Sequence, residues 1–529
     1  MLEEPGIFLH NLWKISITSV ILTESKTMRA IKINKSDNVA VVIANATKGE
    51  CLEGLNVTLL EDVPQGHKVA LVPIKKGEAC IRYGVVLGFL TEDVEPGRWI
   101  NEHMLKIAPS PQLSELKAGH EGVIPDYDPE RKTWMGYDNG PGKFAGTRNI
   151  LGISTTVQCC AGPLRAAVDR IRRTILPKYP NVDEVSALIH PYGCGVAINA
   201  PDAVIPIRSV KNLAHHPNFG NEIMLVSLGC EKLQISQVLE PDEINSDNVI
   251  VLQECDGFKG MIDSICEMAE KKLKKLNERK RVELPLSKLC VGTQCGGSDA
   301  FSGLSANPSI GYAFDLLSKG GATCLFSEVT EVRDAVYIIA NRCQDDETVE
   351  KLKKEIGWYD RYLAKGEVDR AANTTPGNKK GGLSNIIEKS MGSIAKSGNG
   401  PIADVIGPAE IPTKPGTVFA ATPASDIVCG PTQLASGIGL QVFSTGRGTP
   451  YSLKEIPVIK LCTRHDIRKQ WPDIFDIDTG DIITGEGNFH DVGLQVYNLI
   501  LDVASGKKSC AEELGIYNDL IIDNPAPIT

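Results

Sequence analysis

Cys290-Val-Gly-Thr-Gln-Cys-Gly-Gly-Ser-Asp299 is an apolar run that ends in a cluster of small and reactive residues. The same pattern recurs along the chain, and the later clusters are Ser327-Glu328, Thr422-Pro-Ala-Ser-Asp426 and Ser444-Thr-Gly-Arg-Gly-Thr449. An open α/β sheet binds its ligands at the carboxyl ends of its parallel strands, where such clusters lie. The stretch therefore predicts a parallel sheet that carries the active site of an enzyme.

Strand-like runs alternate with helix-length spacers after Pro285, which predicts a large parallel sheet in residues 285–529. These runs are Leu289–Gly292, Ala322–Phe326, Val418–Ala421 and Val458–Leu461. The Gly-, Ser- and Lys-rich stretch 374–400 interrupts the alternation. Long irregular segments inside compact domains are usually functional, so this stretch predicts a loop or lid.

The remainder of the chain divides at changes in pattern. Short β-branched runs between Gly/Pro turns predict a small all-β domain at residues 28–104, and the proline-containing stretch 105–135 predicts a linker. Alternating helical and strand patterns predict an α/β middle domain at 136–284. Residues 1–27 precede the first clean pattern, and we expect a disordered extension or a start assigned too far upstream.

Composition narrows the class of protein. The 529 residues are 42% hydrophobic and 23% charged, which is typical of a globular protein and not of a membrane-spanning one. A net charge of −10 disfavours nucleic acid and anionic membranes as partners but allows a small anionic substrate. The N-terminal region lacks the pattern of a secretory signal, so we expect a cytoplasmic protein with its 15 cysteines mostly reduced.

Several loops combine glycine with basic residues or histidine. Glycine lets the backbone approach a ligand, and a fixed cation recognises a carboxylate or phosphate. The candidates for anion binding are Arg82, Arg148, Lys379, Lys380 and Arg447. His67 and His190 each lie in a Gly-containing loop next to an apolar run, and either could transfer a proton or bind a metal, although a lone histidine in a turn is more often a surface residue.

Three carboxylates, Asp299, Glu328 and Asp426, each close a cluster at a predicted strand end. If the strands are neighbours, these oxygens would form a site for a divalent cation, and their alternative role is capping of helices. A dinucleotide-binding glycine motif is absent, which disfavours a nicotinamide enzyme.

These motifs together resemble the altronate/galactarate dehydratase family over essentially residues 28–529. The residues that carry the resemblance are Pro64–Leu71, Gly146–Asn149, His190–Gly195, Leu228–Glu231, Gln294–Asp299 and Ala421–Asp426. The resemblance implies an N-terminal β-clip (SAF-like) domain, a middle domain used for homodimer contact and a Rossmann-like C-terminal domain with a metal site.

The resemblance also implies a hydro-lyase that converts galactarate to 5-dehydro-4-deoxy-D-glucarate with a divalent metal ion, Fe²⁺ first and Mn²⁺ or Ca²⁺ as alternatives. We place the metal on Asp299, Glu328 and Asp426 with Cys295 nearby, and the proton transfers on His67 and His190. The basic residues named above would then bind the two carboxylates of the sugar diacid.

Two alternatives stay open. The substrate could be altronate or another sugar acid, with an iron–sulfur cluster on Cys194, Cys230 and Cys295 activating the departing hydroxyl. In a different class, the protein could bind a sugar acid without turning it over.

Overall fold

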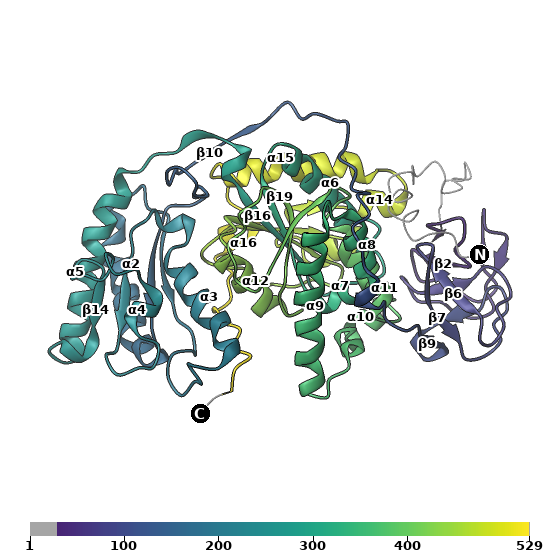
Figure 1. Cartoon of the computed structure of the whole chain (residues 1–529). Coiled ribbons are helices and arrows are strands. Elements are labelled where there is room, and N and C mark those ends of the chain that lie inside the picture. The colour runs from purple at the N-terminus through teal and green to yellow at the C-terminus, as the bar shows by residue number, and fades with distance from the viewer. Residues whose placement is uncertain (1–28, 528–529) are drawn as a thin grey trace.

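The computed structural model describes residues 29–527, so the expectation for residues 1–27 lies outside the described part of the chain. The chain forms an N-terminal all-β part, a middle α/β part and a C-terminal α/β part (Figure 1). The C-terminal part lies between the other two, which are at opposite ends of the molecule. This layout confirms the predicted fold class. Among the helices of residues 29–527, none has the length and apolar character that a membrane crossing requires.

The N-terminal β-clip domain consists of short antiparallel strands around small apolar cores. One sheet contains β1 (Ala30–Ile31), β2 (Val39–Val42), β5 (Lys68–Ala70) and β8 (Trp99–Ile100), in that order. A second contains β6 (Ala79–Arg82), β7 (Val85–Leu90) and β9 (Leu105–Ile107), and β3 (Cys51–Leu52) pairs with β4 (Val57–Thr58). The strands are short because turns with positive-φ glycines, such as Gly66 at +83°, interrupt them.

The middle domain has a parallel sheet of four strands in the order β12 (Glu184–Leu188), β11 (Ile150–Thr155), β13 (Leu225–Ser227) and β14 (Val249–Val251). Alternate residues of β11 face opposite sides, as a strand requires. Leu151 and Ile153 pack with α2 (Ala161–Thr174) and α5 (Gly257–Glu278), whereas Ile150 belongs to the core beneath α3 (Val204–Ala214). A short helix, α4 (Ile235–Val238), follows β13.

The C-terminal domain contains a seven-stranded parallel sheet. Its strand order is β18 (Ile402–Ile406), β19 (Gly416–Ala420), β17 (Thr323–Phe326), β16 (Cys290–Cys295), β20 (Leu440–Thr445), β21 (Val458–Cys462) and β22 (Ile477–Asp478). The chain first places β17, β18 and β19 on one side of β16, with β19 inserted between β18 and β17, and then returns to place β20 on the other side of β16. The carboxyl ends of β16 and β20 therefore form a topological switch point, where such sheets bind ligands.

Helices cover both faces of this sheet. The core on one face includes residues of α6 (Ala306–Lys319) and α15 (Phe489–Ala504), and α12 (Asp426–Ala435) contributes to the core on the other. The remaining helices are α7 (Val329–Val332), α8 (Val336–Arg342), α9 (Asp346–Lys365), α10 (Pro376–Lys380), α11 (Ile386–Ala395), α13 (His465–Gln470), α14 (Gly480–Thr484) and α16 (Cys510–Leu514).

Two predicted segments differ in detail. The first residues of the predicted linker form β9, which pairs with β7, and its last residues enter β10 (Thr133–Gly136), which pairs with β15 (Val282–Pro285). The stretch 374–400 is largely helical and not a loop, because Thr375 and Asn385 cap α10 and α11 at their N-termini. The small residues of α11 allow it to be buried throughout.

Candidate active site

A cavity of about 640 Å³ lies between the β-clip domain and the C-terminal domain, where β20 and β21 end. The two domains contribute different kinds of side chain. The β-clip domain supplies His67 and Trp99, and the C-terminal domain supplies Lys379 and Lys380 at the end of α10, Arg447 after β20 and Arg464 after β21. The site is thus formed by segments that are far apart in the sequence.

Basic side chains outnumber acidic ones in the lining of the cavity. Its lining contains four Lys and Arg residues, and the only carboxylate among the lining residues is Glu102. Cations on a shared concave surface attract a small polyanion and hold its carboxylates by charge-assisted hydrogen bonds. The structure brings Lys379, Lys380 and Arg447 together as the sequence analysis expected, and their role in binding substrate stays a prediction.

His67 is 7% exposed and its ring nitrogens have defined surroundings. The indole nitrogen of Trp99 lies 3.1 Å from His67 Nδ1, and an indole N–H can only donate, so Nδ1 accepts and Nε2 carries the proton of the neutral ring. Nε2 lies 3.4 Å from the Lys380 carbonyl, which is a weak hydrogen bond. Burial, with a smaller contribution from Lys68, lowers the pKa of His67. His67 is therefore a neutral N–H donor at the cavity wall.

Lys68 and Arg82 attach the β-clip domain to the C-terminal domain. Both pair with Glu388 on α11, and Lys68 Nζ lies 2.9 Å from one of its carboxylate oxygens. Lys68 also donates to the Gly382 carbonyl at 2.7 Å, and Arg82 donates to the Ala300 carbonyl at 2.9 Å. Arg82 is 1% exposed. Its predicted role in binding substrate is therefore corrected to one at the domain junction, where it helps to place His67.

Asp299 fixes Arg464 at the cavity wall. It forms an ion pair with the Arg464 guanidinium and accepts hydrogen bonds from Thr463 Oγ1 at 3.1 Å and from the backbone N–H groups of Phe301 and Ser302. Its oxygens are thus occupied by donors. The structure contradicts the prediction that Asp299 is a metal ligand, because the side chain that follows β16 turns to the β21 loop.

A buried cluster in the C-terminal domain contains two other predicted metal ligands. Cys295, Glu328 and Glu331 each place a ligand atom within 4.8 Å of the others, and Asp426 does not belong to this group. Asp426 instead accepts a hydrogen bond from Gln294 at 2.9 Å. The predicted set of Asp299, Glu328, Asp426 and Cys295 is therefore not assembled. Glu331, which the sequence analysis missed, lies beside Glu328 and Cys295.

The buried cluster does not fit a divalent ion, because ammonium groups already occupy it. Lys396 Nζ lies 2.7 Å from Glu328 Oε2 and 3.2 Å from Cys295 Sγ, and Lys389 Nζ lies 2.8 Å from Glu331 Oε1. Burial, followed by the neighbouring Glu331, raises the pKa of Glu328, and burial raises the pKa of the Cys295 thiol to about 11. A metal would have to displace Lys396 and deprotonate the thiol. We therefore assign no catalytic step to a metal here.

Arg148 is also a structural residue. Its guanidinium pairs with Glu512 at 2.7 Å and donates to the backbone carbonyls of Val503 and Lys507. These bonds tie the start of the middle domain to the C-terminal part of the chain. The prediction that Arg148 binds a substrate carboxylate is therefore corrected, because its donors are used inside the protein.

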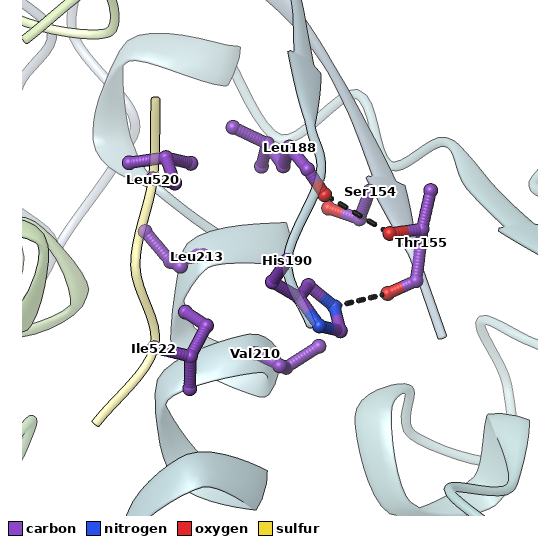
Figure 2. Close-up of a pocket in the computed structure, with 8 residues that line it drawn as sticks. All are labelled: Ser154, Thr155, Leu188, His190, Val210, Leu213, Leu520 and Ile522. Carbon is purple, nitrogen blue, oxygen red and sulfur yellow. Dashed lines mark hydrogen bonds between the residues drawn. The ribbon is translucent and has the colours of Figure 1, made fainter. Parts of the chain in front are cut away.

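His190 follows β12 in the middle domain, and Figure 1 shows this domain at the opposite end of the molecule from the β-clip domain, which contains His67. Figure 2 shows the surroundings of His190. Its Nε2 lies 2.8 Å from the Thr155 carbonyl, and Leu520 and Ile522 of the C-terminal tail line the same apolar pocket, which has no space for a water molecule. Burial lowers the pKa of His190 to about 4. The predicted proton-transfer pair of His67 and His190 is therefore not assembled, and His190 is a neutral packing residue.

The cysteines proposed for an iron–sulfur cluster are separated as well. Cys295 is buried in the large sheet of the C-terminal domain, whereas Cys194 and Cys230 are exposed in the middle domain. That set of three cannot share one cluster.

Sequence reasoning missed Arg464, Trp99, Glu388, Glu331 and Lys396. Two of these residues had a signal in the sequence. Arg464 lies two residues after the end of β21, and Glu331 follows Glu328 by three residues, the spacing of neighbours on a helix. No local sequence pattern pointed to Trp99, Glu388 or Lys396, because their roles depend on which distant side chains pack against them.

Family models match three successive parts of the chain. They are the "Altronate/galactarate dehydratase SAF domain" at residues 28–108, the "D-galactarate dehydratase/Altronate hydrolase, second domain" at 136–277 and the "D-galactarate/Altronate dehydratase, C-terminal" at 286–527. Together they include all the elements that form the cavity.

Curated relatives match over nearly their full lengths. Galactarate dehydratase (L-threo-forming) of Escherichia coli K12 is 48% identical over 519 residues, which cover 96% of this chain and 99% of the relative. Altronate dehydratase of Bacillus subtilis 168 is 31% identical, with 92% and 98% covered, and altronate dehydratase of E. coli K12 is 30% identical, with 92% and 97% covered.

Proposed function

The chain belongs to the D-galactarate/altronate dehydratase family, and from this premise we propose that it is a hydro-lyase that converts galactarate to 5-dehydro-4-deoxy-D-glucarate. The identity of 48% to a galactarate dehydratase, against 31% and 30% to two altronate dehydratases, supports galactarate as the substrate. All three relatives are named as dehydratases, and this supports catalysis by the chain rather than binding of a sugar acid alone.

The observation that carries the choice of a diacid is the arrangement of cations in the cavity. Lys379 and Lys380 come from α10, and Arg447 and Arg464 come from the ends of β20 and β21. Two basic pairs on separate elements suit a substrate with a carboxylate at each end. Altronate, which has one carboxylate, would leave one pair without a partner.

His67 supplies the N–H donor for the reaction. Dehydration removes the proton next to a carboxylate and expels the hydroxyl on the neighbouring carbon, so negative charge develops on substrate oxygens. A neutral imidazole N–H stabilises such an oxygen without carrying a charge of its own. A fixed donor stabilises the developing charge more strongly in a closed site than in water. The weak bond from Nε2 to the Lys380 carbonyl is readily exchanged for a bond to substrate.

The proposal includes a divalent metal ion because the family resemblance implies one, and Fe²⁺ is the preferred ion. When bound, such an ion would neutralise charge on the substrate's oxygens. Since the acidic cluster does not fit it, no step is assigned to it.

The proposed enzyme is a cytoplasmic homodimer. All 15 cysteines are free, which suits a reducing compartment. Phe258 on α5 of the middle domain is 75% exposed, which supports a subunit contact through that domain. Light scattering of the purified protein tests the dimer.

The proposed function is tested with a panel of galactarate, glucarate and altronate, assayed for 2-keto acid formation under reducing conditions with Fe²⁺, Mn²⁺ and Ca²⁺ in turn. We expect the highest kcat/KM with galactarate and restoration of chelator-treated enzyme by Fe²⁺. A preference for altronate would place the chain with the altronate dehydratases, and binding without a keto product would make it a sugar-acid-binding protein.

Trp99→Phe is expected to move the acidic limb of the kcat profile to higher pH. The indole N–H stabilises neutral His67 by occupying Nδ1, so its removal raises the His67 pKa toward its ordinary value. Activity that needs the neutral ring is lost as the pH falls through this pKa, and the loss then begins at a higher pH. Trp358→Phe, which removes an indole N–H bonded to Asp202, is the control. Superimposable profiles would show that Trp99 does not set the state of His67.

A further inference from the structure

Three exposed thiols lie at one edge of the middle domain, far from the proposed active site. Cys159, Cys194 and Cys230 follow β11, β12 and β13, and β11 pairs with both of the other strands. Cysteine is among the most buried residue types. The chain nevertheless exposes four cysteines, and three of the four are at the carboxyl ends of these adjacent strands. We call this group the thiol edge.

The loops that carry the thiol edge are fastened to one another. Glu231 accepts hydrogen bonds from Thr156, from Ser227 Oγ at 2.5 Å and from the Gly229 N–H at 2.7 Å. Glu231 therefore joins the loop after β11 to the loop after β13.

Gly193 joins the third loop to the other two. Its carbonyl accepts the backbone N–H groups of Lys232 at 3.0 Å and Leu233 at 3.2 Å. Its φ is +110°, and a Cβ at this position would lie 1.9 Å from the Thr156 carbonyl oxygen, so only glycine permits this contact. The three thiols are thus presented by one rigid unit at the ends of adjacent strands.

The thiols of the thiol edge are accessible to a metal because they are exposed. Cys159 lies two residues before the first residue of α2, and Cys230 Sγ accepts a hydrogen bond from Gln253 Nε2 at 3.2 Å. The neighbouring Cys160 is fully buried in the apolar core of the middle domain. Cys160 is therefore not a ligand, and three exposed sulfurs are left.

The three sulfurs are not assembled at the spacing of a single tetrahedral ion. Zn–S bonds of about 2.3 Å place the sulfurs of one tetrahedral ion about 3.8 Å apart. In residues 29–527, Cys159, Cys194 and Cys230 do not form a group whose ligand atoms lie within 4.8 Å of one another. An iron–sulfur cluster accepts wider spacing, because each thiolate binds a different iron.

We propose that Cys159, Cys194 and Cys230 bind an iron–sulfur cluster in the middle domain, with one iron left open to a small ligand. The proposal goes beyond the proposed dehydration, and it replaces Cys295 of the earlier set by Cys159. The cluster site lies in a different domain from the cationic cavity (Figure 1).

The test uses the full chain, reconstituted without oxygen with ferric iron, excess dithiothreitol and sulfide and then desalted. We expect iron and acid-labile sulfide in about equal amounts, together with visible absorbance. The triple variant Cys159→Ser, Cys194→Ser, Cys230→Ser should lose both, and Cys51→Ser, which removes the exposed thiol of the β-clip domain, should keep both.

Alkylation of the wild-type protein keeps the test decisive if the triple variant fails to fold. With iron and sulfide bound, iodoacetamide should modify Cys51 and spare the thiol edge, as read by peptide mass spectrometry. Equal modification of all four cysteines, retention of the cluster by a folded triple variant, or binding of zinc alone without sulfide would overturn the proposal.

Discussion

Replacing His67 with alanine is expected to lower kcat for galactarate by about 10²- to 10⁴-fold, the usual worth of one positioned acid–base group. Both ring nitrogens of His67 are held at the cavity wall, Nδ1 by Trp99 and Nε2 by the Lys380 carbonyl. The four cations remain in the variant, so we expect KM to change much less than kcat. Steady-state kinetics with galactarate measure both.

The fold should survive this change, because the junction ion pairs next to His67 are untouched. Circular dichroism and the thermal midpoint should match the wild type, and His215→Ala, a surface histidine paired with Glu243, should keep full activity. A folded His67→Ala variant with unchanged kcat would remove His67 from the reaction.

Replacing Glu388 with glutamine is expected to reduce the free energy of unfolding by about 3–5 kcal/mol, the usual cost of removing one partner from a buried ion pair. Burial alone would raise the pKa of Glu388, but Lys68 and Arg82 outweigh it and hold the pKa below its usual value. The carboxylate is therefore ionised, and its loss leaves two buried cations without a counter-charge. Urea denaturation measures the change.

The same variant should lower kcat, because Lys68 follows His67 directly and its pairing with Glu388 holds the β-clip domain in place. Asp128→Asn removes the partner of Lys132 in an exposed pair and should leave the denaturation midpoint unchanged. If Glu388→Gln were as stable as this control, the buried junction would not hold the two domains together.

The sequence predicted the parts of the site that depend on local pattern. Apolar runs that end in Gly, Ser and basic residues placed Arg447 at a strand end, and the carboxyl ends of parallel strands converge, so Arg447 lies in one cavity with Lys379 and Lys380. His67 was found by its glycine turn before a strand. The alternation of strands and helices likewise predicted the large sheet.

The sequence could not predict which charges are neutralised inside the protein. Arg82 is paired with Glu388, 306 residues further along, and Arg148 with Glu512, 364 residues further along. Both arginines have the local features of anion binders, and only the docking of the domains determines their partners. The Asp299 carboxylate is similar, because its partner Arg464 comes from a different strand.

A crystal structure with galactarate bound tests the central claim most directly, namely that the cavity between the β-clip and C-terminal domains is where the diacid is held. The account predicts one carboxylate against Lys379 and Lys380, the other against Arg447 and Arg464, and His67 beside the carbon chain. Galactarate bound at the thiol edge of the middle domain, or anywhere else outside the cavity, would contradict it.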